Sequence, residues 1–214
     1  MTATRAIGAA CDKVILVIVR ALALSRIHPN VLTFIGLLVN AAAAALLASG
    51  RFLAAGVVIM VAGLFDMVDG RVARETNRVT RFGGFFDSVL DRYSDLVLLM
   101  GLLVYYASIN RFFYVVLTAV VMTGSVMVSY TRARAECTIP RCKVGFMERP
   151  ERVVLLIIGA VFDRMAPVLW IIAVIANLTV IHRVIFTWWE TKRLGDAQMR
   201  PARTTEAAPG RPGD

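Results

Sequence analysis

Long apolar runs separated by short polar segments dominate the middle of the chain. They occupy residues 31–49, 52–65, 96–107, 112–129, 153–162 and 165–182. About twenty apolar residues cross a bilayer core of roughly 30 Å, and flanking polar residues can be drawn in where helices pack together. The pattern therefore predicts an all-α integral membrane protein with six transmembrane helices. Their expected extents are 30–49, 52–74, 83–107, 111–134, 150–162 and 165–189.

The first 28 residues have a different pattern, in which basic residues interrupt the apolar ones at intervals. These basic residues are Arg5, Lys13, Arg20 and Arg26. No continuous apolar region followed by a small-residue cleavage site is present, so a cleavable signal is not expected. The spacing instead favours an amphipathic helix over residues 1–28 that lies in the membrane interface with its basic side chains at anionic headgroups. A seventh spanning helix is the alternative.

Two further segments complete the expected organisation. Residues 191–214 are rich in Pro, Gly, Ala and charge, which predicts a disordered cytoplasmic tail. Residues 29–190 form the predicted membrane domain, in agreement with a mean hydropathy of +0.69 over the whole chain. Three cysteines and two histidines do not supply a credible zinc site, so the cysteines are interpreted as free thiols.

The formal charge of +9 raises the possibility of nucleic-acid binding, but the distribution of the charge argues against it. Almost all of the 24 lysines and arginines fall on one side of the predicted helices, and only Arg51, Arg111 and Arg164 lie on the other. Positive residues concentrate on the cytoplasmic side of membrane proteins. We therefore expect a multi-pass protein of the cell (inner) membrane, with both termini and the polar loops in the cytoplasm and no nucleic-acid partner.

The stretch from residue 65 to residue 95 places acids where charge is expensive. Asp66 and Asp69 are three positions apart, and Asp87, Asp91 and Asp95 follow at intervals of four, so each set shares one face of a helix. The two predicted helices are antiparallel and meet at a short cytoplasmic loop. The acids are therefore expected to face one another at the same depth, one to two helical turns below the cytoplasmic surface.

Carboxylates held together cannot all stay ionised without a counter-charge. Either they share protons, or they bind hard divalent ions, for which all-oxygen ligation is typical. Two metal ions held between carboxylates are a common arrangement in phosphoryl chemistry, and glycines such as Gly70 and Gly83 let a phosphate approach the backbone. Pairing with nearby arginines is the structural alternative. Those arginines are Arg71, Arg74, Arg81 and Arg92.

The spacing Asp66-x2-Asp69-Gly70-x2-Ala73-Arg74-x8-Gly83-x3-Asp87-x3-Asp91 resembles the signature of the CDP-alcohol phosphotransferases at every defined position. The resemblance covers nearly all of residues 5–190 and implies the same architecture of an interfacial helix followed by six spanning helices. It also implies a homodimer and two divalent ions per site, Mg²⁺ or Mn²⁺.

The resemblance assigns roles to particular residues. Asp66, Asp69, Asp87 and Asp91 would hold the metal ions, and Asp91 would also be the general base that takes the proton of the acceptor hydroxyl. The CDP part of a CDP-linked lipid would be bound by Asn30, Val31, Leu32, Thr33, Gly70, Arg74 and Thr80. Asp95 lies outside the signature, and we expect it to form a salt bridge with Arg92 or with a loop arginine rather than to act in catalysis.

The acceptor alcohol has to be inferred from other segments. SYTRARAE at 129–136 and MERPER at 147–152 resemble the inositol-phosphate branch, the phosphatidylinositol phosphate synthases of bacteria and their archaeal counterparts. In that branch Arg132, Arg152 and Arg183 would bind the acceptor phosphate, although some members carry Lys at the position of Arg132. Converging arginines can make bidentate bonds to a phosphate. The other basic residues nearby are interpreted as topology or headgroup charges. They are Arg134, Arg141, Lys143 and Arg149.

The sequence therefore predicts an enzyme that transfers the phosphatidyl group of CDP-diacylglycerol to a hydroxyl of an inositol phosphate and releases CMP. A phosphatidylglycerophosphate synthase, or an enzyme for another acceptor, is the alternative within the family. An ion-coupled transporter that uses the aspartates as ligands is more remote, because the acids lie toward one face and no internal repeat is visible. A non-catalytic scaffold is disfavoured by the intact acidic set.

Overall fold

The computed structural model describes the chain over residues 29–75 and 80–198, and the side chains of residues 67–75 and 195–198 lie outside the description. Within these ranges every regular element is an α-helix. The helices are α2 (Pro29–Ala48), α3 (Phe52–Glu75), α4 (Arg81–Ser108), α5 (Phe112–Ala135), α6 (Arg149–Val161) and α7 (Met165–Gln198). The expected interfacial helix at 1–28 falls outside the described residues.

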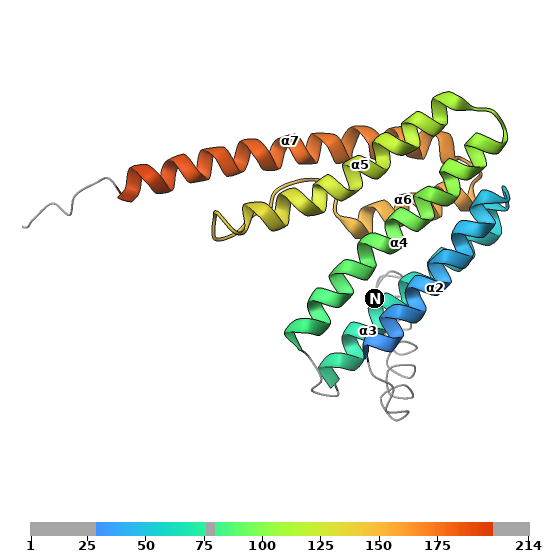
Figure 1. Cartoon of the computed structure of the whole chain (residues 1–214), viewed down its shortest axis with the longest axis horizontal. Helices are drawn as coiled ribbons and strands as arrows, with labels where there is room; N and C mark the ends of the chain where they lie inside the picture. Colours follow the sequence, from blue (N-terminus) through green and yellow to red (C-terminus); the bar gives the residue numbers. More distant parts are fainter. Residues whose placement is uncertain (1–28, 76–79, 199–214) are drawn as a thin grey trace, which may run out of the picture.

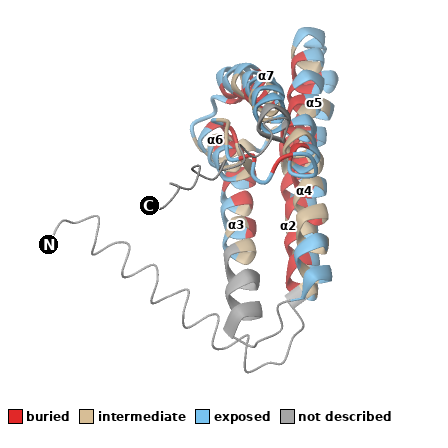
Figure 2. Ribbon diagram, turned by 90° about the vertical axis from the view of Figure 1, so that its left-hand side faces the viewer, coloured by how far each residue is buried: buried red, intermediate tan, exposed pale blue. Residues whose placement is uncertain are grey.

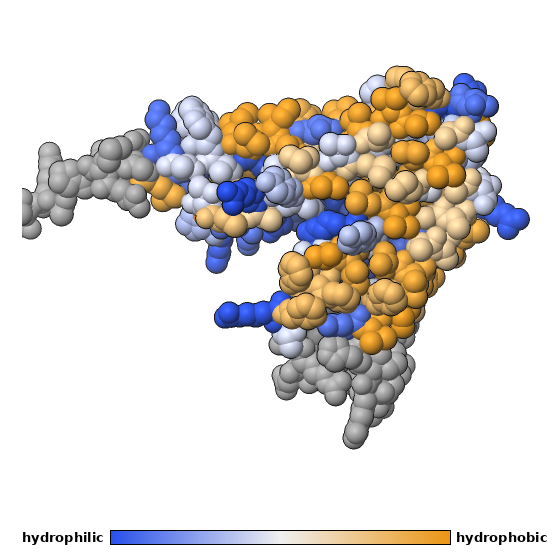
Figure 3. All heavy atoms as spheres, viewed as in Figure 1, coloured by the Kyte–Doolittle hydropathy of each residue, from blue (hydrophilic) through white to orange (hydrophobic). Residues whose placement is uncertain are grey.

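The helices form two groups that meet at one end and diverge at the other (Figure 1). Helix α2 packs against α3 and α4, and α5 packs against α7. Helix α6 contacts both α3 and α7, and α4 contacts α5, so these helices join the groups. Hydrophilic side chains gather in the angle between the two groups, whereas the joined end is largely apolar (Figure 3).

Tight turns connect the helices at the joined end. Each turn contains one residue with a positive φ: Gly50 at 72°, Asn110 at 55° and Asp163 at 51°. A left-handed residue just after a helix lets backbone N–H groups reach back to the last carbonyls, and Gly, Asn and Asp tolerate that conformation best. The turn chemistry therefore fixes this end of the bundle and leaves the other end, with its longer connections, for the polar residues.

Buried residues lie on the helix faces that meet, and exposed residues lie on the outer faces (Figure 2). Many of the exposed residues are large and apolar. Leu47, Leu98 and Leu169 are at most 1% exposed, whereas Phe112 is 77% exposed. Exposed apolar side chains on an outer face are expected where lipid, rather than water, is the solvent. The core therefore sits between the helices, and the outer surface suits a bilayer.

Within the described residues, three helices are long and apolar enough to cross a membrane. They comprise Asn30–Ala48, Phe112–Ala135 and Met165–Leu194. The apolar part of α3 covers Phe52–Asp66, α4 is interrupted by its aspartates, and α6 has 13 residues and a length of about 20 Å. The six predicted segments are confirmed as helices, and their crossing of the membrane stays a prediction for α3, α4 and α6.

Helix α7 is longer than the sequence pattern predicts. It has 34 residues and continues to Gln198, so the first part of the expected disordered tail, residues 191–198, is helical. The segment TKRLGDAQ contains no proline, and Lys, Arg, Leu, Ala and Gln favour helices. The rest of the expected tail lies outside the described residues.

Gly101 allows α2 and α4 to approach one another closely. A Cβ atom at this position would lie 2.3 Å from the carbonyl oxygen of Ala44, which is backbone and cannot rotate away. We expect Gly101→Ala to destabilise the protein by about 1–3 kcal/mol, since overpacking forces the helices apart. Thermal unfolding in detergent measures the effect. Gly63→Ala is the matched control, because a Cβ there has no neighbour within 4 Å, and an equal loss of stability in both variants would contradict the prediction.

Candidate active site

Four acids from two antiparallel helices lie toward the diverging end of the bundle. Asp66 belongs to α3, and Asp87, Asp91 and Asp95 belong to α4. The start of α4 is fixed by Thr80, whose Oγ1 accepts a hydrogen bond from the backbone N–H of Gly83 at 2.9 Å. Helices α3 and α4 both pack against α2 rather than against each other, and Asp66 and Asp91 lie close enough for one guanidinium, that of Arg149, to contact both. The acids therefore lie at similar depth, as the spacing predicts. Asp69 lies on α3, with its side chain outside the description.

Arg149, the first residue of α6, supplies the counter-charge for these acids. Its Nη2 lies 2.6 Å from Asp66 Oδ2, its Nη1 lies 3.0 Å from Asp91 Oδ1, and its Nε lies 3.5 Å from Asp95 Oδ1. The interpretation of Arg149 as a topology or headgroup charge is therefore wrong. The guanidinium instead turns inward, because the neighbouring carboxylates stabilise its charge more than an apolar surface can.

Asp95 also pairs with a second arginine of α6. Arg152 Nη2 lies 2.7 Å from Asp95 Oδ2, and both residues are buried, at 4% and 7% exposed. The predicted salt bridge of Asp95 is confirmed, but its partner is not Arg92. Arg92 donates instead to the carbonyl oxygen of Ser88 and, at 2.9 Å, to the hydroxyl of Ser88, one turn earlier on α4.

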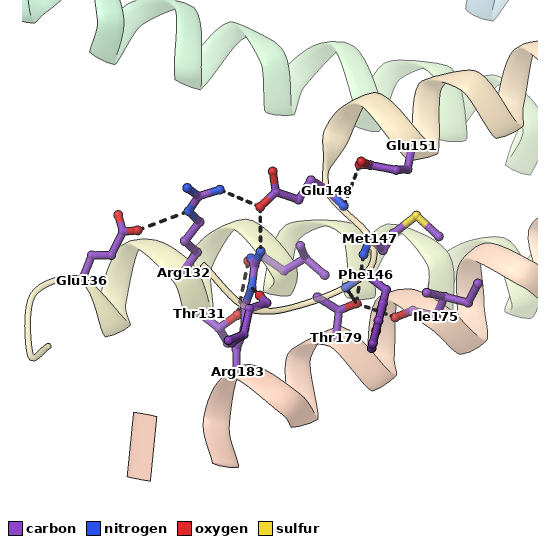
Figure 4. Close-up of polar contacts among 12 residues, drawn as sticks. Thr131, Arg132, Glu136, Phe146, Met147, Glu148, Glu151, Ile175, Thr179 and Arg183 are labelled. Atoms are coloured by element: carbon purple, nitrogen blue, oxygen red, sulfur yellow. Dashed lines mark hydrogen bonds and ion pairs between the residues drawn. The ribbon is translucent and has the colours of Figure 1, made fainter. Parts of the chain in front are cut away.

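A second cluster, next to the first, is built around the carboxylate of Glu148 (Figure 4). Its Oε1 lies 2.8 Å from Arg132 Nη1 and 3.3 Å from Arg183 Nη2, so residues from α5 and α7 share one oxygen. Arg132 also reaches Glu136 Oε1 at 3.3 Å. Of the three arginines predicted to bind the acceptor phosphate, Arg132 and Arg183 meet at Glu148, whereas Arg152 is engaged with Asp95.

Arg183 is held in place by the backbone around it. It is 1% exposed, its Nε donates to the carbonyl oxygen of Val144 at 2.8 Å, and its Nη1 donates to that of Val128. A buried guanidinium needs such partners, since an unpaired charge in an apolar bundle is costly. Arg183 therefore positions the loop before α6 and also directs Nη2 toward Glu148.

Thr179 of α7 fastens the same loop. Its hydroxyl oxygen accepts from the backbone N–H groups of Phe146 and Met147 at 3.3 and 3.2 Å (Figure 4). Gly145 makes this contact possible: its φ is +119°, and a Cβ would lie 2.4 Å from Thr179 Cγ2. Glu148 then caps the start of α6, with its backbone N–H donating to Glu151 Oε2 at 3.0 Å.

The residues predicted to hold the CDP group are partly brought together. A Cβ on Gly83 would lie 3.0 Å from Thr80 Oγ1 and 3.4 Å from Asn30 Oδ1, so the starts of α2 and α4 adjoin. Val31 is exposed, whereas Leu32 and Thr33 are buried at 2% and 7%. Gly70 and Arg74 lie on the last turns of α3, with their side chains outside the description.

The carboxylates at the first cluster fit the hard cations that the sequence implies. The donors are oxygens only, and a cationic group already lies between Asp66 and Asp91. Gly36 of α2 leaves room beside them, because a Cβ there would lie 3.2 Å from Asp66 Oδ1. Among the side chains that the structure describes, no group of three or more His, Cys, Asp or Glu is already arranged to hold a metal ion.

Comparison with known proteins decides the family. Residues 26–192 match the family model for CDP-alcohol phosphatidyltransferases. The chain belongs to the CDP-alcohol phosphatidyltransferase family. The resemblance seen in the aspartate signature is therefore confirmed, and the chain is an all-α membrane enzyme of phosphatidyl transfer.

Several relatives of this CDP-alcohol phosphatidyltransferase are named for inositol phosphate products. It is 36% identical over 171 residues to the archaetidylinositol phosphate synthase of Pyrococcus horikoshii, covering 77% of this chain and 86% of the relative. It is 35% identical over 182 residues to the phosphatidylinositol phosphate synthase of Mycobacterium tuberculosis, covering 80% of this chain and 84% of that protein.

Two crystal structures of the Mycobacterium tuberculosis enzyme share the fold. The structure with bound CDP-DAG matches with a TM-score of 0.76 and 31% identity, over 82% of this chain and 94% of the other. The complex with manganese and citrate matches with a TM-score of 0.74 and 33% identity, over 80% and 87%. A CDP-linked lipid and a divalent metal are thus both bound by a relative with this fold.

Proposed function

We propose that the protein transfers the phosphatidyl group of CDP-diacylglycerol to a hydroxyl of an inositol phosphate and releases CMP. The observation that carries the proposal is the adjacency of two charge sites. Asp66 and Asp91 attract cations on one side of the α6 start, and Arg132 and Arg183 attract an anion on the other. A metal-dependent donor site beside a phosphate site is what a phosphorylated acceptor needs.

In the proposed reaction Asp91 accepts the proton of the attacking hydroxyl. The hydroxyl oxygen forms a bond to the phosphorus that carries the diacylglycerol, and the bond from that phosphorus to the oxygen of CMP breaks. Two Mg²⁺ or Mn²⁺ ions, held by Asp66, Asp69, Asp87 and Asp91, would neutralise charge on the pyrophosphate. The Asn30–Thr33 corner, Gly70, Arg74 and Thr80 would orient the CDP group, so that the phosphorus faces Asp91.

Arg132, Arg152 and Arg183 would bind the acceptor phosphate. Arg132 is the most accessible of them, with 36% of its side chain exposed. Arg152 keeps Nε and Nη1 without a hydrogen-bond partner among the described residues. Guanidinium groups bind phosphate through paired N–H bonds, and a neutral alcohol would not require this charge. The charges therefore favour inositol phosphate over unphosphorylated inositol.

The proposal includes the arrangement in the membrane. All six helices of residues 29–190 would cross the inner membrane, with residues 1–28 as an interfacial helix and the active site and both termini in the cytoplasm. The protein would form a homodimer through its membrane helices. Exposed alanines on α2, at Ala41, Ala42 and Ala45, suit close contact between helices.

The test uses the purified full chain with CDP-diacylglycerol, Mn²⁺ and one of three acceptors: inositol phosphate, inositol or glycerol 3-phosphate. We expect CMP release with inositol phosphate only. Arg132→Gln should raise the KM for inositol phosphate by roughly 10- to 100-fold, because a charge-assisted bond to the phosphate is lost. The KM for CDP-diacylglycerol should stay within about twofold, since Arg132 belongs to the acceptor site.

Arg134→Gln is the matched control, because Arg134 is exposed two positions away and makes no ion pair within the described residues. Equal effects of the two variants would show that Arg132 acts only through general charge. Transfer to glycerol 3-phosphate but not to inositol phosphate would overturn the acceptor assignment, and no transfer to any alcohol would overturn the proposed function.

A further inference from the structure

Arg149 occupies the place that the proposed function gives to metal ions. Its two terminal nitrogens lie 2.6 and 3.0 Å from oxygens of Asp66 and Asp91, and these residues come from two different helices. The side chain is 24% exposed and reaches its partners from a third helix, α6. A single guanidinium thus links α3, α4 and α6 through carboxylates that also have a role as metal ligands.

The guanidinium and a divalent ion compete for the same two carboxylates. A carboxylate oxygen that ligates Mg²⁺ or Mn²⁺ lies about 2.1 Å from the metal, and a guanidinium 2.6 Å from the same carboxylate would bring two cations into near contact. Like charges at such a distance repel strongly in a bundle of low dielectric. A divalent ion on Asp66 and Asp91 is therefore expected to weaken their ion pairs with Arg149, and Arg149 in turn to weaken the binding of the ion.

We propose that Arg149 is a tethered counter-ion, which holds Asp66 and Asp91 in the metal-free protein and leaves them when divalent ions bind. The proposal rests on the proposed function, from which it takes the metal ligands. It adds that the metal-free site is neutralised by the chain itself. Metal loading is therefore an exchange of one cation for another, and metal affinity includes the free energy of displacing Arg149.

Asp95 gives the displaced side chain a place to go. Arg149 Nε already lies 3.5 Å from Asp95 Oδ1 and makes no hydrogen bond within the described residues. The other oxygen, Oδ2, is held by Arg152 at 2.7 Å, so Oδ1 is the oxygen directed at Arg149. Because Asp95 lies outside the aspartate signature, a shift of Arg149 toward it would free Asp66 and Asp91 without leaving the guanidinium unpaired.

The test measures Mn²⁺ binding to the purified full chain without any lipid substrate, by the electron paramagnetic resonance signal of free Mn²⁺. We expect Arg149→Gln to bind Mn²⁺ at least roughly tenfold more tightly than the parent protein, because the competing cation is removed. The melting temperature of the metal-free variant should fall, since its acids lack a counter-charge, and Mn²⁺ should raise that temperature more than in the parent.

Arg92→Gln is the matched control. It removes the same charge from α4 beside the acids, but Arg92 bonds to Ser88 and makes no carboxylate ion pair within the described residues. We expect its Mn²⁺ affinity to change by less than about threefold. An equal gain in Mn²⁺ affinity in Arg92→Gln and Arg149→Gln would overturn the inference, since the loss of any positive charge near the acids would then explain both gains. Arg149→Lys keeps the charge and is the second variant, for use if Arg149→Gln does not fold. A gain in the Mn²⁺ affinity of Arg149→Lys that is smaller than tenfold then supports the inference.

The outcomes separate this inference from the proposed function. Mn²⁺ affinity that is unchanged or weaker in the folded Arg149 variants overturns the counter-ion role and leaves the proposed function standing. Failure of Mn²⁺ to bind to the parent and to the variants overturns both. Tighter Mn²⁺ binding with loss of CMP release supports the counter-ion role and gives Arg149 a second task during transfer.

Discussion

Asp91→Asn is expected to lower the rate of CMP release by at least about 10²–10⁴-fold, the range that a positioned general base contributes. The amide of Asn has nearly the same shape as the carboxylate but takes up no proton and is a poorer metal ligand. The structure also predicts that the variant folds, because Arg149 keeps its contacts with Asp66 and Asp95 when the contact with Asp91 is weakened. Measured CMP release and thermal unfolding together check both parts.

Asp163→Asn is the matched control for this substitution. Asp163 has a φ of 51° in the turn between α6 and α7, a conformation that Asn tolerates as well as Asp, and the turn lies at the opposite end of the bundle. We expect transfer by Asp163→Asn to equal that of the parent. Near-normal transfer by Asp91→Asn would contradict the assignment of Asp91 as general base.

The second large effect is expected at the buried pair of Asp95 and Arg152. Asp95→Asn should reduce the free energy of unfolding by about 3–5 kcal/mol, because it leaves the Arg152 guanidinium buried without its charge partner. Arg152 is 4% exposed and already has Nε and Nη1 without hydrogen bonds within the described residues, so it has no other carboxylate to replace Asp95 Oδ2. Denaturant-induced unfolding in detergent measures the loss.

A double variant tests the physical reason. Asp95→Leu combined with Arg152→Leu removes both charges, and replacement of a buried pair by apolar residues is often neutral. We therefore expect the double variant to be more stable than Asp95→Asn alone. A double variant that is less stable than either single variant would show that the two helices depend on polar contacts beyond this ion pair.

The helices and the acidic face could be predicted from the sequence, because both depend on local spacing. The expected extents, drawn from the apolar runs and the polar residues that flank them, match each helix to within a few residues, except that α7 continues beyond the apolar pattern into residues that favour helix by propensity alone. Intervals of three and four positions place Asp66 and Asp87 on faces that can meet. The short connection between α3 and α4 then leaves an antiparallel arrangement as the simplest one.

The partner of those acids could not be predicted in the same way. Arg149 and Asp66 are 83 positions apart, and only the packing of α6 against α3 brings them together. A weak signal was present in the sequence: Arg149 and Arg152 are three positions apart at the start of a helix and therefore share a face. An inward role for Arg152 and an outward role for Arg149 were thus inconsistent with each other.

Glu148 and Arg149 are consecutive residues, and their charges serve two different clusters. Glu148 lies between Arg132 and Arg183, and Arg149 lies between Asp66 and Asp91. Their Cα atoms are separated by one peptide unit of about 3.8 Å, so a ligand that shifts the start of α6 at one cluster also shifts the backbone that anchors the other side chain. Binding of metal ions at Asp66 and Asp91 and binding of the acceptor phosphate at Arg132 and Arg183 are therefore expected to be coupled. By thermodynamic linkage each of these ligands changes the affinity for the other by the same factor.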